Sequence, residues 1–447
     1  MISDTETIAA VATPPGKGGI GIVRVSGPLV ASIANAIVGR MLTPRIASVA
    51  VFRDAKGRFI DEGIALFFQA PKSFTGEDVL ELQGHGGSVV LDLILRRCLE
   101  LGARVARPGE FTERAYLNGK LDLAQAEAVA DMIESSTALA VRLAGQSLQG
   151  VFSRRIKTLI EHLVQLRMLV EATLDFPDED IDFATEQSVE SDLHKLIEMT
   201  RQVMKEAHQG QMIREGLVVV IAGLPNVGKS SILNALTCTD SAIVTPIPGT
   251  TRDLLKLDIQ VDGLPIRIVD TAGIRQAMDP VEQEGVRRAR EQMVKADLVL
   301  WVYDSIEGAG QIGCEDLTLD CPITNVRNKI DLLGLDPQLT ESKSGTEIFL
   351  SAATGAGIDL LRSHLKSMAG LGSTPEGAFI ARRRHLDALS RGMQSLDVAL
   401  QHLMNKRDAE LVAEELFQAQ QVFGEITGQF TSDDLLGRIF SSFCIGK

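Results

Sequence analysis

The sequence predicts a multidomain protein in which a doubly wound α/β domain is inserted into a helical domain, after an N-terminal α+β domain. Three observations predict this organisation. The chain has 447 residues, more than one domain usually holds. Between about residues 216 and 370, short apolar runs alternate with helical segments, as in βαβ units around a parallel sheet. Blocks rich in Leu, Ala, Glu and Gln flank that region on both sides and favour helices that pack on one another.

The domain limits follow these changes of composition. The first segment is rich in glycine and in short β-branched runs such as Ile20–Val25. From Leu121 to about Leu174, apolar residues recur every three or four positions, which predicts one long amphipathic helix or a pair. The predicted domains are 1–119 (α+β), 120–212 (helical, first part), 213–371 (α/β) and 372–447 (helical, second part).

The charge balance limits how the chain can meet nucleic acid. Lys and Arg number 45 against 59 Asp and Glu, a net charge of −14. Such a chain repels bulk nucleic acid, so an RNA partner requires a local basic patch or a second protein. Arg382–Arg384 is a local basic cluster that fits either a phosphate contact or a solvated helix face.

Cysteine usage and hydropathy indicate the compartment. The five cysteines are widely spaced and form no C-x-x-C pair, so neither a disulfide framework nor a zinc site is expected. The N-terminus does not resemble a signal peptide. No run of about 18 apolar residues occurs, so no membrane helix is predicted. We expect a cytoplasmic protein without membrane contact.

A phosphate-binding loop is predicted at Gly223–Ser230, which fits G-x-x-x-x-G-K-S directly after a continuous apolar run. The glycines allow backbone N–H groups to surround phosphates, and the following helix directs its N-terminal dipole at the anion. Lys229 is expected to reach the β- and γ-phosphates, and the Ser230 hydroxyl to bind magnesium.

Four further segments follow in the order expected of a Ras-like P-loop GTPase domain. Pro248–Asp253 occupies the switch position, where a threonine hydroxyl, Thr251, completes the magnesium shell. Asp270–Gly273 ends a strand, with the aspartate near magnesium and the glycine amide near the γ-phosphate. Asn328–Asp331 has the form N-K-x-D, whose aspartate accepts two hydrogen bonds that guanine can donate and adenine cannot, and Ser351–Ala353 is the supporting loop. The predicted GTP-binding residues are Asn226, Val227, Gly228, Lys229, Ser230, Ser231, Thr245, Pro246, Ile247, Pro248, Gly249, Thr250, Thr251, Asp270, Thr271, Ala272, Gly273, Asn328, Lys329, Asp331, Ser351 and Ala352.

The residue after the D-x-x-G glycine differs from that of many small GTPases. They place a glutamine after the D-x-x-G glycine to orient the attacking water, whereas this chain has Ile274 there. An apolar side chain cannot position water. Charge stabilisation and water positioning must therefore come from elsewhere. Glu282, Arg275 and a bound cation are candidates, although each of the two side chains also fits a solvated surface charge.

The complete motif series resembles the TrmE/Era/EngA branch of bacterial GTPases. Leu435–Lys447, which ends in F-C-I-G-K, resembles the C-terminus of the MnmE (TrmE) family of tRNA modification GTPases. Ala12–Gly21, Phe74–Asp78 and Ala106–Ala115 match the N-terminal domain of the same family. The resemblance spans essentially the whole chain.

The resemblance implies a tRNA-modifying enzyme. The family acts with a flavin-dependent partner, MnmG, in a heterotetrameric complex, and installs an aminomethyl or carboxymethylaminomethyl group on carbon 5 of the wobble uridine. The one-carbon unit comes from 5-formyl- or methylene-tetrahydrofolate, bound at an N-terminal domain that also forms the homodimer. The implied folate-binding residues are Arg24, Glu81, Lys120 and Lys447.

The resemblance also implies a potassium-dependent GTPase. Asn226 matches a potassium ligand, and the carbonyls of Thr245 and Ile247, with Thr250, complete the site. The implied catalytic residues are Lys229, Glu282, which positions water, and Cys444. For Cys444 two interpretations stay open, a thiol in the modification centre and a small buried hydrophobic side chain.

Two alternatives share part of this evidence. A ribosome-assembly GTPase of the Era or EngA type shares the nucleotide motifs, but carries a basic RNA-binding domain where this chain is helical and acidic after Gly370. A non-catalytic GTP-dependent interaction switch would use the N-terminal domain only for dimerisation.

Overall fold

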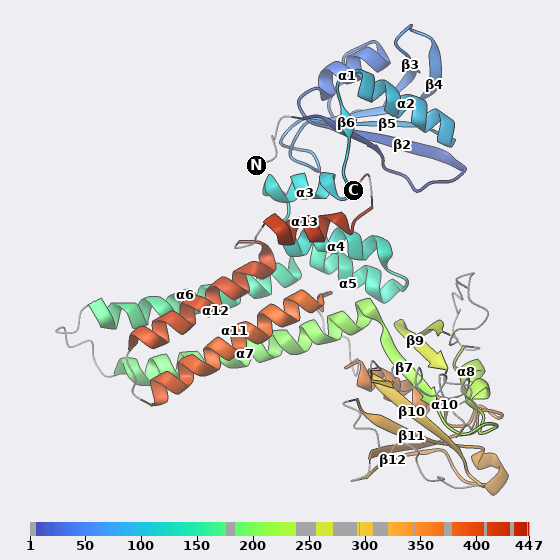
Figure 1. Cartoon of the computed structure of the whole chain (residues 1–447), viewed down its shortest axis with the longest axis vertical. Helices are drawn as coiled ribbons and strands as arrows, with labels where there is room; N and C mark the ends of the chain where they lie inside the picture. Colours follow the sequence, from blue (N-terminus) through green and yellow to red (C-terminus); the bar gives the residue numbers. More distant parts are fainter. Residues whose placement is uncertain are drawn as a thin grey trace, which may run out of the picture. The chain divides into compact units, whose positions relative to one another are not determined.

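The computed structural model describes residues 6–175, 184–237, 256–270, 293–294, 296–306, 321–342, 345–370, 378–405, 409–429, 433–444 and 446. The chain divides into two compact units (Figure 1). The first unit comprises 1–130, 148–194 and 394–447, and the second comprises 131–147 and 195–393. Among the described helices, none has the length and apolar character needed to cross a membrane.

The first unit contains a sheet with helices α1 and α2 on one face. Its strand order is β3-β4-β5-β2-β1-β6, and Ile33 and Ile94 lie in the core that the sheet shares with these helices. Side chains alternate across the sheet, so Leu80 and Leu82 of β5 enter this core while Glu81 lies on the opposite face. On that second face, Ile8 and Ala10 of β1 are buried with Phe111. The bounds are β1 Ile8–Val11, β2 Gly18–Ser26, α1 Val30–Val38, β3 Ser48–Arg53, β4 Phe59–Phe68, β5 Val79–Gly86, α2 Ser88–Glu100 and β6 Arg104–Val105.

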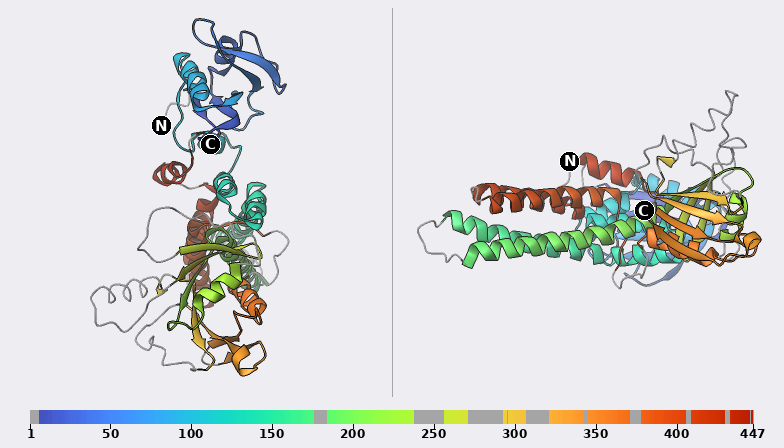
Figure 2. Two further views of the ribbon diagram at one scale, coloured as in Figure 1. Left: turned by 90° about the vertical axis from the view of Figure 1, so that its right-hand side faces the viewer. Right: turned by 90° about the horizontal axis from the view of Figure 1, so that it is seen from below.

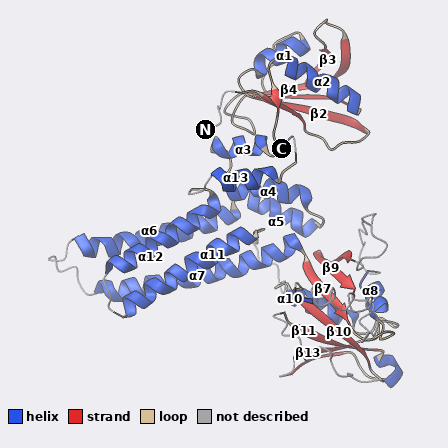
Figure 3. Cartoon of the chain, viewed as in Figure 1, coloured by secondary structure: helices blue, strands red, loops and turns tan. Residues whose placement is uncertain are grey.

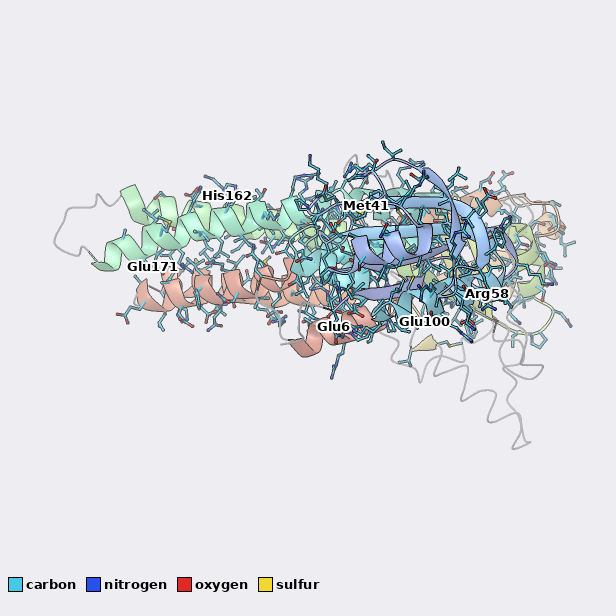
Figure 4. All side chains as sticks on the ribbon, turned by 90° about the horizontal axis from the view of Figure 1, so that it is seen from above. Glu6, Met41, Arg58, Glu100, His162 and Glu171 are labelled. Atoms are coloured by element: carbon cyan, nitrogen blue, oxygen red, sulfur yellow. The ribbon has the colours of Figure 1, made fainter. Side chains whose placement is uncertain are left out.

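Helices complete the first unit. Helices α6 and α12 pack along each other (Figure 2). Leu159, Leu163 and Leu166 are the buried stripe of α6, whereas His162 and Glu171 project from it (Figure 4). The bounds are α3 Glu110–Leu117, α4 Leu123–Glu134, α6 Val151–Asp175, α12 Ala409–Thr427 and α13 Asp433–Ser441, and the last residues of α4 belong to the second unit.

The second unit contains the doubly wound sheet that the sequence predicts (Figure 3). Its order is β12-β13-β11-β10-β7-β9-β8; the five central strands are parallel and the two edge strands antiparallel. The predicted fold class is confirmed. The bounds are α5 Ala138–Leu148, α7 Ala184–Glu215, β7 Leu217–Ala222, α8 Lys229–Thr237, β8 Lys256–Val261, β9 Leu264–Asp270, β10 Leu298–Asp304, β11 Ile323–Asn328, the 3₁₀ helix η1 Ile330–Leu333, β12 Gln338–Ser342, β13 Gly345–Phe349, α10 Ile358–Met368 and α11 Arg383–Met404. Leu148, α7 up to His194 and α11 from Gln394 belong to the first unit.

The helical stretch after Leu121 differs from the prediction of one long helix or a pair, because it forms three helices. The first break lies before α5, where the Thr137 hydroxyl accepts a hydrogen bond from the Ala140 N–H at 3.1 Å and caps the new helix. The second lies at Gly150, whose φ of 80° is unfavourable for other residues. Both breaks span only a few residues, so the apolar periodicity continues across them.

Asp131 contacts both chain segments that connect the helices with the inserted sheet. Its side chain is only 4% exposed. It accepts hydrogen bonds from Arg214 Nε, at the end of α7 before β7, and from Arg382 Nη2, just before α11, both at 2.7 Å. Nearby, the Ser147 hydroxyl accepts a bond from the Ile380 N–H at 2.9 Å. Both crossing segments are thereby fixed to α4 and α5.

Asp131→Ala should destabilise the second unit by about 3 kcal/mol, because it leaves two guanidinium groups without their buried carboxylate. Trp301 on β10 is the chain's single tryptophan, so its fluorescence in a urea titration reports on this unit. Asp387→Ala is the matched control, since Asp387 forms an exposed ion pair with Arg391. This substitution should lower the free energy of unfolding by less than about 1 kcal/mol. Equal midpoints for the two variants would contradict this role of Asp131.

Candidate functional site

The predicted phosphate loop joins β7 to α8 at the carboxyl edge of the parallel sheet, where ligands bind in doubly wound folds. Gly223 has φ of 144°, and a Cβ there would overlap the carbonyl oxygen of Val302. Val227 is 2% exposed and anchors the loop in the core. The Lys229 ammonium donates hydrogen bonds of 2.8 Å to the carbonyls of Gly223 and Leu224 and closes the loop. These contacts give the loop a compact backbone that places the lysine within it.

Asn328 connects three predicted nucleotide-binding segments. It ends β11 and is 2% exposed. Its Nδ2 donates to the Val227 carbonyl at 2.8 Å, and its Oδ1 accepts from the Ala352 N–H at 3.0 Å. The phosphate loop, the N-K-x-D loop and the supporting loop therefore meet at one amide group.

The remaining residues of the N-K-x-D loop are held by local contacts. Lys329 has a left-handed backbone, with φ of 63°, and its ammonium lies 2.7 Å from Asp304 Oδ2. Asp331 lies in the short helix η1 and is exposed. Ser351 is buried, and its hydroxyl accepts a bond from the Thr354 N–H at 3.3 Å. The carboxylate of Asp331 is thus accessible to a ligand, while the loop around it is fixed.

The structure describes only part of the predicted GTP site. Ser230 and Ser231 lie in the exposed first turn of α8, and Asn226 is exposed with φ of 65°. Strand β9 ends at Asp270. The other predicted residues of this site and its catalytic groups lie outside the described residues: Thr245, Pro246, Ile247, Pro248, Gly249, Thr250, Thr251, Thr271, Ala272, Gly273, Ile274, Arg275 and Glu282.

A second group of polar residues lies on the face of the N-terminal sheet opposite α1 and α2. Arg24 on β2 stands opposite Glu81 on β5, and Arg24 Nε donates to Glu81 Oε1 at 3.0 Å. The guanidinium carbon lies 5.8 Å from the ring centres of both Phe74 and Phe111. The arrangement combines a cation, a carboxylate and aromatic rings on one sheet face, which suits a flat heterocyclic ligand with polar edges.

Of the two further residues predicted to bind folate, the structure describes Lys120. Lys120 donates from Nζ to the Pro71 carbonyl at 3.0 Å, beside the loop that carries Phe74. Arg24 Nη1 lies 3.5 Å from the carbonyl oxygen of Gly446, so the C-terminal tail passes next to the Arg24–Glu81 pair. Lys447 lies outside the described residues.

Cys444 is exposed, which disagrees with its interpretation as a buried hydrophobic side chain. Its neighbour Phe443 is buried and packs with Phe440, and the Cys444 carbonyl accepts a bond from the Gly109 N–H at 3.3 Å. The tail is therefore anchored on both sides of an accessible thiol.

Sequence analysis did not identify Asp304 as part of the nucleotide site. It is 8% exposed, and hydrogen bonds from the Ile306 N–H and from Lys329 lower the pKa of its carboxyl group. A signal was present, because Asp304 ends a parallel strand at the edge of the sheet where the other loops lie.

Gly228→Ala should weaken GTP binding by at least about a hundredfold. A Cβ at Gly228 would overlap Nδ2 of Asn328 and push the phosphate loop away from the guanine loop. Gly345→Ala is the control, because Gly345 also has a positive φ, of 118°, but its nearest neighbour would lie 3.4 Å from a Cβ. Displacement of a fluorescent GDP analogue measures both affinities. Similar affinities in the two variants would show that backbone conformation, and not the overlap, determines the result.

Comparisons with known proteins identify the family. Residues 123–444 match the model described as MnmE helical domain, and residues 7–120 match the model described as GTP-binding protein TrmE N-terminus. The protein named tRNA modification GTPase MnmE in Methylococcus capsulatus is 56% identical to this chain over 445 residues, which cover 99% of both chains. The protein of the same name in Pseudomonas aeruginosa is 55% identical to this chain over 455 residues, which cover 100% of both chains. Among solved structures, an Era variant from Aquifex aeolicus bound to GDP and aluminium fluoride is 26% identical, with 40% of this chain and 66% of that chain covered and a TM-score of 0.27. The predicted family is confirmed: this chain belongs to the MnmE (TrmE) family of tRNA modification GTPases.

Proposed function

We propose that this chain hydrolyses GTP to GDP and couples that reaction to modification of carbon 5 of the wobble uridine in certain tRNAs. The observation that carries the GTPase assignment is the amide of Asn328, which joins the phosphate loop to the guanine loops at 2.8 and 3.0 Å. Membership of the MnmE family supports the tRNA substrate. The product is 5-aminomethyl or 5-carboxymethylaminomethyl uridine.

Two cations belong to the proposed GTP site. Magnesium would be held by Ser230 and Thr251, and the exposed position of Ser230 in the first turn of α8 suits this role. Potassium would be held by Asn226, the carbonyls of Thr245 and Ile247, and Thr250. The exposed side chain and left-handed backbone of Asn226 support its part in that set. A bound cation supplies positive charge where negative charge develops, a function that Ile274 cannot perform, and Glu282 would position the attacking water.

The N-terminal sheet is the proposed site for a tetrahydrofolate derivative, in the 5-formyl or methylene form. Arg24, Glu81, Lys120 and Lys447 would hold it. The partly buried Arg24–Glu81 pair beside Phe74 supports this assignment, because the cation suits a carboxylate and Glu81 suits the N–H edge of a pterin. When bound, the folate supplies the one-carbon unit, and the residues bind and orient it. The exposed thiol of Cys444, on a tail that reaches Arg24 through Gly446, would act in the modification centre.

The proposed partners are a second copy of the chain and the flavoprotein MnmG, in a heterotetrameric complex in the cytoplasm. Exposed apolar side chains on the N-terminal sheet support the homodimer. Ile20 and Ile64 are 68% and 38% exposed and line a hollow of about 210 Å³ together with Gln83 and His85. Burial of such side chains against a second copy would remove them from water.

In a strain that lacks this protein, tRNA should lose its modified wobble uridine, and the wild-type gene should restore it. Arg24→Ala and Cys444→Ser should fail to restore it, while both purified variants should retain GTP hydrolysis within about twofold, because neither residue lies in the GTP site. Nucleoside analysis of total tRNA by mass spectrometry is the measurement. An unchanged profile in the deletion strain would refute the proposed modification, whatever the GTPase rate.

Calorimetry with 5-formyltetrahydrofolate measures folate binding independently of GTP hydrolysis and tRNA modification. Wild type should bind, and Arg24→Ala should bind at least about tenfold more weakly because it loses a charge-assisted contact. Arg58→Ala is the matched control, since Arg58 is 72% exposed in an ion pair with Asp54. Equal binding by all three proteins would exclude Arg24 from the site.

GTP hydrolysis should be at least about tenfold slower in sodium chloride than in potassium chloride, because the smaller cation fits the Asn226 site poorly while Ile274 offers no substitute. Steady-state phosphate release at equal ionic strength measures the effect. Asn226→Ala should remove the difference between the two salts. Equal rates for the wild type in both salts would refute the cation site.

A further inference from the structure

Asp304 contacts two segments at the edge of the guanine-binding loop. It is the last residue of β10 and stands opposite Asn328 of β11 in the parallel register. One carboxylate oxygen, Oδ2, lies 2.7 Å from Lys329 Nζ, and the other accepts a bond from the Ile306 N–H at 2.9 Å. The next residue adds a third link, from the Ser305 N–H to the Asn328 carbonyl at 3.0 Å. The turn after β10 is thereby fixed to the N-K-x-D loop.

Lys329 requires support from outside its own loop. Its φ of 63° is in the left-handed region, which costs an L-residue with a Cβ about 1 kcal/mol. It stands between Asn328, which holds the phosphate loop, and the segment that carries Asp331. A shift in the Lys329 backbone would therefore displace both neighbours. The ion pair opposes that shift, and because the carboxylate is only 10% exposed, it is weakly screened by water.

We propose that Asp304 is a positioning residue for guanine nucleotide binding, which acts through Lys329 without touching the nucleotide itself. It fixes the lysine side chain and, through it, the spacing between the amide of Asn328 and the carboxylate of Asp331. The ligand class is guanine nucleotides, both GTP and GDP, because the contact lies on the base side of the site and not beside the phosphates. This inference rests on the GTP-binding part of the proposed function and is independent of tRNA modification.

Asp304→Asn keeps the shape of the side chain and removes its charge. We expect the Kd for GTP and for GDP to rise by about tenfold each, equivalent to about 1.4 kcal/mol. The KM for GTP should rise by a similar factor, and kcat should fall much less, because the chemistry takes place at the other end of the nucleotide. Displacement of a fluorescent GDP analogue, with active sites titrated, gives affinities that do not depend on the folded fraction.

Asp297→Asn, just before the same strand, is the matched control. Asp297 precedes β10 and accepts a bond from the Val218 N–H at 2.8 Å, at the opposite end of the sheet from the nucleotide loops. Its replacement tests for a general loss of sheet stability and should leave both affinities within about twofold of wild type.

A double-mutant cycle tests whether Asp304 acts through Lys329. Lys329→Met alone should weaken binding, and adding Asp304→Asn should weaken it no further, because the partner is already absent. Wild-type affinity in Asp304→Asn would overturn the proposal, and so would an additive loss in the double variant. Nucleotide binding is measured without tRNA, so these outcomes are separate from a failure of the proposed modification chemistry.

Discussion

The carboxylate of Asp131 is the contact on which the placement of the inserted sheet depends. A buried carboxylate is costly unless it is paired, and its two partners come from the entering and the returning segment of the insertion. These segments also touch each other, since Gln209 Nε2 donates to the Gly370 carbonyl at 2.9 Å. A Cβ at Gly210 would overlap the Phe379 carbonyl oxygen. Strand β7, which leads into the phosphate loop, therefore begins immediately after a double anchor.

Helix α4 contributes residues to both units. In the first unit, Leu123 and Ala126 pack with Phe440 and Phe443 in the core that holds the C-terminal tail. In the second unit, Asp131 pairs with Arg214 and Arg382. A single helix thus supplies apolar packing at its start and a buried carboxylate near its end.

The sequence predicted those parts of the site whose requirements are local. Gly223 and Gly228 occupy positions where a Cβ has no room, and such positions mark a phosphate loop through spacing alone. Asp304 and Asp131 could not be assigned in this way. Each is an ordinary aspartate in the sequence, and each acquires its role from residues that are distant in the chain, as with Asp131 and Arg382. The predicted number of helices after Leu121 was wrong for a related reason, because a break of a few residues leaves the spacing of apolar residues nearly unchanged.

Packing makes most of the basic cluster Arg382–Arg384 unavailable to a phosphate ligand. Phosphate binding requires guanidinium groups that reach solvent, since each neutralised phosphate contributes to affinity by releasing counterions. Arg382 is committed to Asp131 and only 16% exposed, Arg384 is half-buried, and Arg383 alone is exposed. One exposed arginine gives little attraction on a chain with a net charge of −14. The positive surface that tRNA binding requires must then come from elsewhere on the chain or from a second protein, which would supply it without changing the acidic balance of the chain.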